Sequence, residues 1–307
     1  MSNKFLKKKG VIINHLASDL LQLKKGDRMP SITEYQSEYD VARGTVQNAL
    51  NYLKTEGALV TKSHGHLGTF IEEIDYTILQ EYALSEAILG TMTLPYSRLY
   101  EGLATGIYEE FKEHNIKLNL AYIRGSKERV RSISTKTYRF AVVSKFAAKR
   151  VIQQGEPLEI VIDFGKQTYL SGHVLLFANR HNNSIEDGMK VAIDYSSLDQ
   201  QMLTNESIQN KQVELVEMPG HQIIHSLKSG QIDAGIWNFD EIRDKNYEEL
   251  NYITLDNNQL EEEMSTSVIV CHQDDTSMEA FFNKSFDMKR ALDIQTQVGD
   301  GTMVPRY

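Results

Sequence analysis

Cysteine is almost absent from this chain of 307 residues, which contains only Cys271. A single cysteine excludes an intramolecular disulfide framework and fits a reducing compartment. Long apolar runs are missing too, because the longest span only about six residues, far fewer than the roughly 20 that a membrane helix needs. Phe5 and Leu6 are followed by three lysines, so no apolar core of a signal peptide is present. We therefore expect a cytoplasmic protein.

Catalytic and metal-binding signatures are also missing. The chain contains no G-x-x-x-x-G-K-[ST], H-E-x-x-H, C-x-x-C or G-x-S-x-G, which are patterns typical of phosphate-binding loops, metal or redox sites and serine hydrolases. His221 and His225 lie four residues apart, but no spacing suggests a third ligand, so we interpret them as an exposed helical pair. The sequence predicts no enzyme, no cofactor and no metal site.

Charge is distributed unevenly along the chain. Residues 1–71 hold ten Lys/Arg and six Asp/Glu, a balance of +4, while residues 72–307 hold 23 Lys/Arg and 36 Asp/Glu, a balance of −13. A basic N-terminal segment on an acidic remainder indicates that any contact with nucleic acid is confined to the N-terminus.

This basic segment carries helix and turn signals in a distinctive order. After a first helical run at residues 5–23, Ser31 and Glu34 form a capping-box pattern that starts a short helix ending near residue 40. A second helix is expected over residues 42–56, where Gly57 ends it. Its buried stripe has the spacing of an amphipathic helix and consists of Val46, Ala49, Leu50 and Leu53.

The opposite face of that second helix is polar and contains almost no acid. It presents Arg43, Gly44, Gln47, Asn48, Asn51 and Lys54. Arginine can pair with guanine and amide side chains with adenine in the major groove. Two strand-like runs, residues 58–62 and 69–72, follow and are joined by a glycine-bearing hairpin that suits a wing. The order predicts a winged helix-turn-helix; the alternative is a small helical domain whose polar face only contacts water.

The segment resembles the winged helix-turn-helix of GntR-type bacterial regulators. The matching residues are Gly26-Asp27, Pro30-Ser31, Glu34, Arg43, Thr45-Val46, Ala49-Leu50, Leu53, Glu56-Gly57 and Gly68-Thr69-Phe70. The resemblance implies that Arg43, Thr45 and Gln47 touch DNA and that Gly68 and Thr69 shape the wing. Thr33, Ala42 and Gln47 depart from the family pattern, which has Arg, Ser and Arg there, so no operator is transferred. The predicted DNA-binding residues are Ser31, Arg43, Gly44, Thr45, Gln47, Asn48, Asn51, His64, Gly65, His66, Gly68 and Thr69.

Beyond residue 86, strand-like and helix-like segments alternate, which predicts an α/β body with largely parallel strands. The expected strands are residues 87–92, 118–123, 139–143, 158–163, 174–178, 190–194, 213–216, 233–237 and 266–271. The expected helices are residues 99–113, 146–153, 198–205, 221–229 and 278–298. The acidic run at residues 260–263 is interpreted as a solvated loop.

Polar residues follow several of these strands at the point where a helix begins. Sheets of this kind bind ligands at the carboxyl ends of their strands, and hydroxyl groups, helix N-termini and arginine suit a small anion such as a carboxylate or phosphate. The alternative for each serine is a simple helix cap. The predicted effector-binding residues are Pro95, Tyr96, Ser97, Arg98, Arg124, Ser126, Ser144, Lys145, Asp194, Ser196, Ser197, Trp237 and Asn238.

The body resembles the type-2 periplasmic-binding-protein fold, through the strings LPYSRLYEGLATGIYEEF, VAIDYSSLDQQ and SLKSGQIDAGIW. The combination of this body with the GntR-like segment is similar to the YhfZ-type regulators. That likeness implies a winged helix-turn-helix over residues 1–72, a linker over 73–86 and a two-lobed effector domain over 87–307. Lobe I would comprise residues 87–172 and 264–307, and lobe II residues 173–263.

The leading hypothesis is a transcription regulator that binds operator DNA as a homodimer and responds to a small polar or anionic metabolite held between two α/β lobes. Two other hypotheses remain open. One is an enzyme on a binding-protein-like fold tethered to DNA, which needs a compact acid–base or nucleophilic cluster. The other is a DNA-binding scaffold whose body only oligomerises, in which the chain's own side chains fill the cleft.

Overall fold

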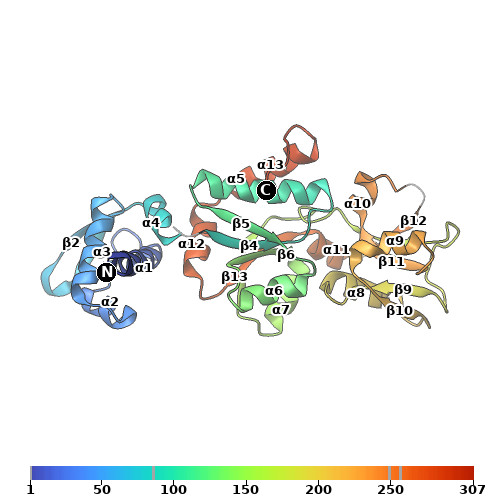
Figure 1. Cartoon of the computed structure of the whole chain (residues 1–307), viewed down its shortest axis with the longest axis horizontal. Helices are drawn as coiled ribbons and strands as arrows, with labels where there is room; N and C mark the ends of the chain where they lie inside the picture. Colours follow the sequence, from blue (N-terminus) through green and yellow to red (C-terminus); the bar gives the residue numbers. More distant parts are fainter. Residues whose placement is uncertain (1, 85–86, 248–249, 256–257) are drawn as a thin grey trace. The chain divides into compact units, whose positions relative to one another are not determined.

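The computed structural model describes residues 2–84, 87–247, 250–255 and 258–307, and its elements are labelled in Figure 1. The last two residues of the predicted linker, 85 and 86, lie outside that set. The chain forms two compact units. The first consists of Met1–Ile88, Phe111–Asn119 and Asp274–Phe286, and the second consists of the remaining residues.

Three helices form the N-terminal part of the first unit, here called the head. They are α1 (Ser2–Leu20), α2 (Ile32–Tyr39) and α3 (Arg43–Thr55). The predicted capping box at the start of α2 is confirmed: the Glu34 backbone N–H donates to the Ser31 hydroxyl, and the Ser31 N–H donates to the Glu34 carboxylate. The predicted stripe of α3 is fully buried, together with Leu16 and Tyr35. Amphipathic packing therefore fixes which face of α3 points outward.

A three-stranded antiparallel sheet completes the head, in the order β1-β3-β2. The predicted hairpin forms from β2 (Leu59–Ser63) and β3 (Thr69–Ile74), which are joined through the 3-10 turn η1 (Gly65–Leu67). The third strand, β1 (Arg28–Met29), was not expected from the sequence. It pairs with β3, so that Arg28 lies opposite Phe70 at the base of the wing.

Two further helices of the first unit pack against the head. The first, α4 (Tyr76–Ala83), falls within the predicted linker and contacts α1. The second, α12 (Thr276–Lys284), comes from far along the chain and places Ala280 in the apolar core of the head. Lys284 donates to the Leu21 carbonyl, and its ammonium lies 4.5 Å from the centre of the Tyr76 ring.

The first of two larger sheets has the strand order β5-β4-β6-β13-β7. Its strands are β4 (Ile88–Met92), β5 (Leu118–Tyr122), β6 (Phe140–Ser144), β7 (Leu158–Asp163) and β13 (Ser267–His272). Helices α5 (Arg98–Glu113) and α13 (Met288–Gly299) lie on one face of this sheet, and α6 (Ser126–Ser134) and α7 (Lys145–Gln153) lie on the other (Figure 1). This sheet and its helices are called the first lobe below.

The second lobe is built on a sheet with the order β10-β9-β11-β8-β12. Its strands are β8 (His173–Phe177), β9 (Lys190–Ile193), β10 (Glu214–Glu217), β11 (Ala234–Asn238) and β12 (Asn251–Thr254). Helix α8 (Leu198–Ser207) shares an apolar core with Leu175 and Phe177 of this sheet, whereas α9 (Ile223–Lys228) shares one with Val174 and Leu176. Successive residues of β8 therefore point to opposite faces, as strand geometry requires.

Several sequence expectations for the body need correction. The sheets are mixed rather than largely parallel, because β13 runs antiparallel to both β6 and β7, and β8 runs antiparallel to both β11 and β12. The helix expected over residues 278–298 is two helices, because Asp287 caps the start of α13 by accepting from the Arg290 N–H. The acidic run at 260–263 lies in helix α11 (Asn258–Ser265). Strand β12 and the helices α6 and α10 (Phe239–Asp244) were not foreseen.

The two lobes touch where α6 begins and where the chain leaves β9. The Lys127 N–H donates to the Ser196 carbonyl at 3.1 Å, and the Leu198 N–H donates to the Ser126 hydroxyl at 3.0 Å. Ser144 at the end of β6 donates to the Asp199 carboxylate at 2.7 Å. These hydrogen bonds hold the lobes together beside a cavity.

Candidate functional site

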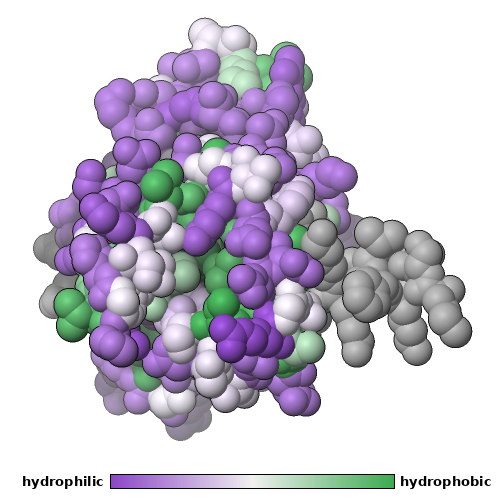
Figure 2. Space-filling model, turned by 90° about the vertical axis from the view of Figure 1, so that its left-hand side faces the viewer, coloured by the Kyte–Doolittle hydropathy of each residue, from purple (hydrophilic) through white to green (hydrophobic). Residues whose placement is uncertain are grey.

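The outer surface of the head contains a groove between α3, the start of α2 and the base of the wing. The view in which the head faces the reader is mainly hydrophilic, with scattered hydrophobic side chains (Figure 2). The residues that line this head groove are Arg28, Met29, Pro30, Ser31, Ile32, Thr33, Arg43, Gln47, Leu50, Asn51, Lys54, Gly68 and Thr69. Three of them are cations and none is an acid, so the groove favours an anion.

Six of the twelve predicted DNA-binding residues line this groove, and they are Ser31, Arg43, Gln47, Asn51, Gly68 and Thr69. Of the other six, Gly44 and Asn48 are exposed elsewhere on α3, and Thr45 is half-buried. Gly65 and His66 lie in the turn at the wing tip. His64 lines a separate depression beside the wing, where its ring packs edge-on against Phe70 at 5.3 Å.

Two cations of the head groove are not among the predicted DNA-binding residues, although Lys54 was expected on the polar face of α3. Lys54 is partly buried and donates to the Thr61 hydroxyl at 2.7 Å, and burial lowers the pKa of its ammonium. Arg28 is exposed on β1. No local signal marks Arg28, because a two-residue strand has no periodicity of its own and is defined only by its pairing with β3.

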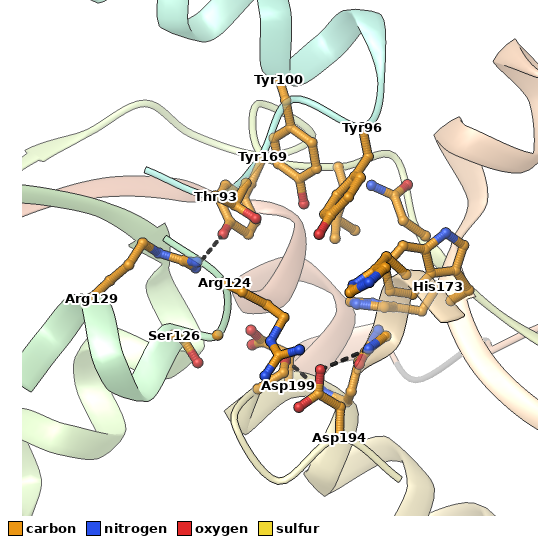
Figure 3. A pocket seen from close by; sticks show the side chains of 18 residues that line it. Thr93, Tyr96, Tyr100, Arg124, Ser126, Arg129, Tyr169, His173, Asp194 and Asp199 are labelled. Carbon is orange, nitrogen blue, oxygen red and sulfur yellow. Dashed lines mark hydrogen bonds between the residues drawn. The ribbon is translucent and has the colours of Figure 1, made fainter. Parts of the chain in front are cut away.

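A second candidate site is the cavity between the two lobes of the second unit. It encloses about 70 Å³ and its side chains are drawn in Figure 3. The lining residues are Thr93, Tyr96, Tyr100, Arg124, Gly125, Ser126, Arg129, Tyr169, Leu170, His173, Asp194, Ser197, Asp199, Gln200, Gly220, His221, Trp237 and Asn238. Both lobes contribute, so the cavity depends on their contact.

Aromatic rings form one wall of this cavity. Tyr96 of the first lobe meets Trp237 of the second at 5.4 Å between ring centres, and Tyr100 meets Tyr169 at 5.0 Å. In Figure 3 the hydroxyl groups of Tyr96 and Tyr100 point toward the middle of the cavity. Trp237 is the chain's only tryptophan, and its indole N–H donates to Glu241 at 2.7 Å. The wall therefore combines apolar surface with hydroxyl groups that can reach a ligand.

Two arginines line the cavity in different ways. Arg129 is 3% exposed and donates to the Ile123 carbonyl at 2.8 Å and to the Tyr169 hydroxyl at 2.9 Å. Its Nε–H has no hydrogen-bond partner among the residues that the structure describes. Arg124 is exposed and makes no hydrogen bond or ion pair with any residue that the structure describes. One guanidinium is thus anchored and the other is free to bind.

Two carboxylates also face the cavity; both oxygens of Asp194 and one oxygen of Asp199 accept hydrogen bonds. Asp194 accepts from the hydroxyl and backbone N–H of Ser196 and from the Gly220 N–H. Asp199 accepts from Ser144. Burial raises the pKa of the Asp199 carboxyl to about 6, against the opposing effects of the Ser144 hydrogen bond and the Arg129 charge.

Two more buried side chains of the cavity each keep a polar atom with no hydrogen-bond partner in the described part of the chain. These atoms are Nδ1 of His173 and Nδ2 of Asn238, on residues that are 5% and 6% exposed. Burial lowers the pKa of the His173 imidazole to about 4, so this ring is neutral at pH 7. Buried polar groups are rarely left unpaired in native proteins, so this concentration in one cavity indicates a place for a ligand.

The predicted effector-binding residues divide into two groups. Seven line the cavity, and they are Tyr96, Arg124, Ser126, Asp194, Ser197, Trp237 and Asn238. Ser97, Ser144 and Ser196 instead make hydrogen bonds within the fold, and Lys145 forms an ion pair with Asp163. Pro95 and Arg98 do not line it, and the Arg98 N–H donates to Asp244.

Sequence reasoning missed several lining residues that the cavity depends on. Arg129 lies one helical turn after Ser126 on α6, so that its position could have been found from the i, i+3 spacing. Asp199 similarly lies in the first turn of α8. Tyr169 and Leu170 come from the connection between the two sheets, where no periodicity gives a signal, and His173 is the first residue of β8.

In the part of the chain that the structure describes, no group of three or more His, Cys, Asp or Glu side chains is arranged to hold a metal ion. His221 and His225 are both exposed, the first in a 3-10 turn and the second in α9. Within the described ranges, no helix has the length and apolar character needed to span a membrane.

Comparison with known proteins assigns both parts of the chain. A family model described as a helix-turn-helix domain matches residues 24–71, and one described as the YhfZ C-terminal domain matches residues 75–307. The Escherichia coli (strain K12) protein "Uncharacterized protein YhfZ" is 30% identical over 307 residues, which is 100% of both chains.

Solved structures support the same assignment. YhfZ from Shigella flexneri matches with a TM-score of 0.62 and 28% identity over 75% of this chain and 99% of that chain. The substrate-binding protein AbpA of an amino acid ABC transporter from Streptococcus pneumoniae, bound to L-arginine, matches with a TM-score of 0.52 and 16% identity. That match covers 71% of this chain and 94% of the other, and it shows a fold like that of two-lobed periplasmic binding proteins. Since the C-terminal model covers well over half of its residues, the chain belongs to the YhfZ family.

Proposed function

We propose that this protein is a transcription regulator of the cytoplasm, which binds operator DNA through a GntR-type head and senses a small anionic metabolite between its lobes. A helix-turn-helix domain joined to a binding-protein-like body is the composition of a regulator rather than an enzyme. The observation that carries the sensing role is the inter-lobe cavity, where Arg129, His173 and Asn238 each keep an unpartnered buried polar atom.

The unpartnered atoms favour a ligand with acceptor oxygens. The Nε–H of Arg129 and the amide nitrogen of Asn238 can only donate hydrogen bonds. Arg124 adds an unpaired positive charge, while the oxygens of Asp194 already accept from Ser196 and Gly220. Hydrogen bonds between ionised partners are stronger than neutral ones, so a carboxylate or phosphate fits this cavity better than an uncharged molecule.

The size of the cavity limits the ligand. About 70 Å³ accommodates roughly five to seven water molecules at about 10–15 Å³ each. A metabolite of similar size fits between the lobes as they stand, whereas a peptide does not. A cavity that remains open to a ligand also argues against a scaffold whose own side chains fill the cleft.

The single tryptophan gives a direct assay for this ligand. Because Trp237 lines the cavity, binding of a small carboxylate or phosphate should change the intrinsic fluorescence and raise the unfolding temperature. Arg124→Gln should weaken each hit at least about tenfold, since a hydrogen bond to a charged group contributes roughly 1.5–3 kcal/mol. Arg131→Gln is the matched control, because Arg131 is an exposed arginine of helix α6, just after Arg124 in the chain, and does not line the cavity.

The link between ligand and DNA needs a second measurement. A homodimer would present two α3 helices to half-sites of a near-palindromic operator about one helical turn apart. Each fluorescence hit is therefore added to a gel-retardation assay on duplexes that the protein enriches from a random library. Hits that bind the cavity but leave retardation unchanged would refute the sensing mechanism while leaving DNA binding intact.

A further inference from the structure

Strand β1 places a cation at the base of the wing that no helix-turn-helix pattern predicts. Arg28 pairs through its backbone with Phe70, and its side chain runs across Gly68. A Cβ atom at Gly68 would lie 2.8 Å from Nε of Arg28, and Gly68 has a φ of 100°. Only glycine adopts this backbone conformation readily and leaves room for the Arg28 side chain. Gly68 of the wing therefore allows Arg28 of β1 to take its position.

The charge of the head groove rests mainly on two of its side chains. Lys54 is partly buried and hydrogen-bonded to Thr61. Arg28 and Arg43 are exposed and make no hydrogen bond or ion pair with another residue that the structure describes. They line the same groove from different elements, Arg43 from the first turn of α3 and Arg28 from the wing sheet. Two guanidinium groups with no acid among the lining residues attract a phosphate, although the Glu34 carboxylate outside the lining also interacts with the charge of Arg28.

Thr33 lines this groove as well. It stands where the resembling family has an arginine, so the groove lacks one cation from α2. Arg28 supplies one cation to the groove from β1.

We propose that Arg28 binds a phosphate of the DNA backbone between the recognition helix and the wing. It would take over this role from the arginine that the resembling family has at the position of Thr33. This inference rests on the proposed DNA-binding function of the head. Arginine contacts with phosphates set the register of a protein on the duplex without reading its sequence. Arg28 therefore contributes affinity and salt dependence, whereas α3 contributes sequence preference.

The test uses the full chain and a duplex that the wild type enriches from a random library. Affinity is measured by fluorescence anisotropy between 50 and 200 mM salt for the wild type, Arg28→Ala and Arg28→Gln. Lys24→Ala is the matched control, because it removes one exposed head cation that does not line the groove. Loss of one phosphate contact makes the slope of log affinity against log salt concentration less steep by about 0.9. The ratio of wild-type to variant affinity should therefore be about 3.5-fold smaller at 200 mM than at 50 mM salt.

Both Arg28 variants should show this smaller slope with an unchanged enriched sequence, and Lys24→Ala should not. Arg28→Ala combined with Thr33→Arg should recover the wild-type slope, because the cation returns to the same groove. A wild-type slope in both Arg28 variants would overturn the proposal, and so would a changed sequence preference at a constant slope. Arg43→Ala tests the head separately: if it leaves enrichment intact, the proposed recognition helix is wrong, whatever Arg28 does.

Discussion

Gly125 lies at the junction of the two lobes and allows a sharp test of their contact. It precedes α6 with a φ of 78° and ψ of 133°. A Cβ atom there would lie 2.5 Å from the Ser196 Oγ and 2.7 Å from the Ser196 carbonyl oxygen. The carbonyl cannot simply swing away, because it accepts the Lys127 N–H across the junction. Gly125→Ala must therefore strain the backbone and push the lobes apart.

The loss of folding stability caused by Gly125→Ala has two parts, backbone strain and overpacking, and a substitution at a second glycine separates them. Gly155 has a φ of 93° but no atom within 4 Å of a Cβ, so Gly155→Ala carries only the backbone strain, about 1–3 kcal/mol. Gly125→Ala adds the overpacking against Ser196, about 1–3 kcal/mol more. At about 2–4 °C per kcal/mol for a domain of this size, Gly125→Ala should melt roughly 2–12 °C below Gly155→Ala.

Thermal unfolding of the two purified variants, followed by circular dichroism, makes this comparison. The same pair also belongs in the fluorescence assay, where Gly125→Ala should weaken ligand binding because the lobes that form the cavity are separated. Equal melting temperatures for Gly125→Ala and Gly155→Ala would show that Ser196 does not contact Gly125, and the described junction of the lobes would be wrong.

Two other predictions concern the second unit. The pKa of about 6 for buried Asp199, against an ordinary 3.8, means that the folded state holds its proton more tightly, so the free energy of unfolding should fall by about 2 kcal/mol as pH rises from 4 to 6. Asp199→Asn keeps the acceptor for Ser144 and should abolish that fall in urea unfolding; parallel curves for both proteins would contradict it. Gly106 lets α13 approach α5, since a Cβ there would lie 2.4 Å from a backbone carbonyl, so Gly106→Ala should cost about 1–3 kcal/mol. Gly299→Ala, at an open position of α13, should be neutral or stabilising by up to about 1 kcal/mol in the same assay.

Local signals predicted the head better than they predicted its groove. The Ser31–Glu34 capping box and the buried stripe of α3 are encoded within a few residues, and both are confirmed. Strand β1 depends on pairing with residues about 40 positions later, which no local pattern reveals. The sequence therefore predicted the α3 side of the groove but not the contribution of Arg28.

In the body, apolar runs located most strands. They did not show that the chain crosses back from the second sheet to the first. An antiparallel β13 between β6 and β7 follows from the second crossing between sheets, and alternation of strands and helices cannot show such a crossing. Helix α11 was read as a loop because its acidic run, residues 261–263, is typical of both a loop and an exposed helix. The cavity residues at strand ends were predicted, whereas Tyr169 and His173 depend on where the first crossing runs.

The packing of α12 on the head has a consequence for biosynthesis. The head sequence is complete at Ile74, yet Thr276–Lys284 places Ala280 in its core and holds Leu21 and Tyr76 through Lys284. A ribosome synthesises that segment only after the head and all the strands of the body. A nascent chain therefore carries an N-terminal head whose last packing partner does not yet exist. Truncations at the C-terminus should accordingly disturb the N-terminal domain, and a head expressed alone should expose apolar surface that the finished protein covers.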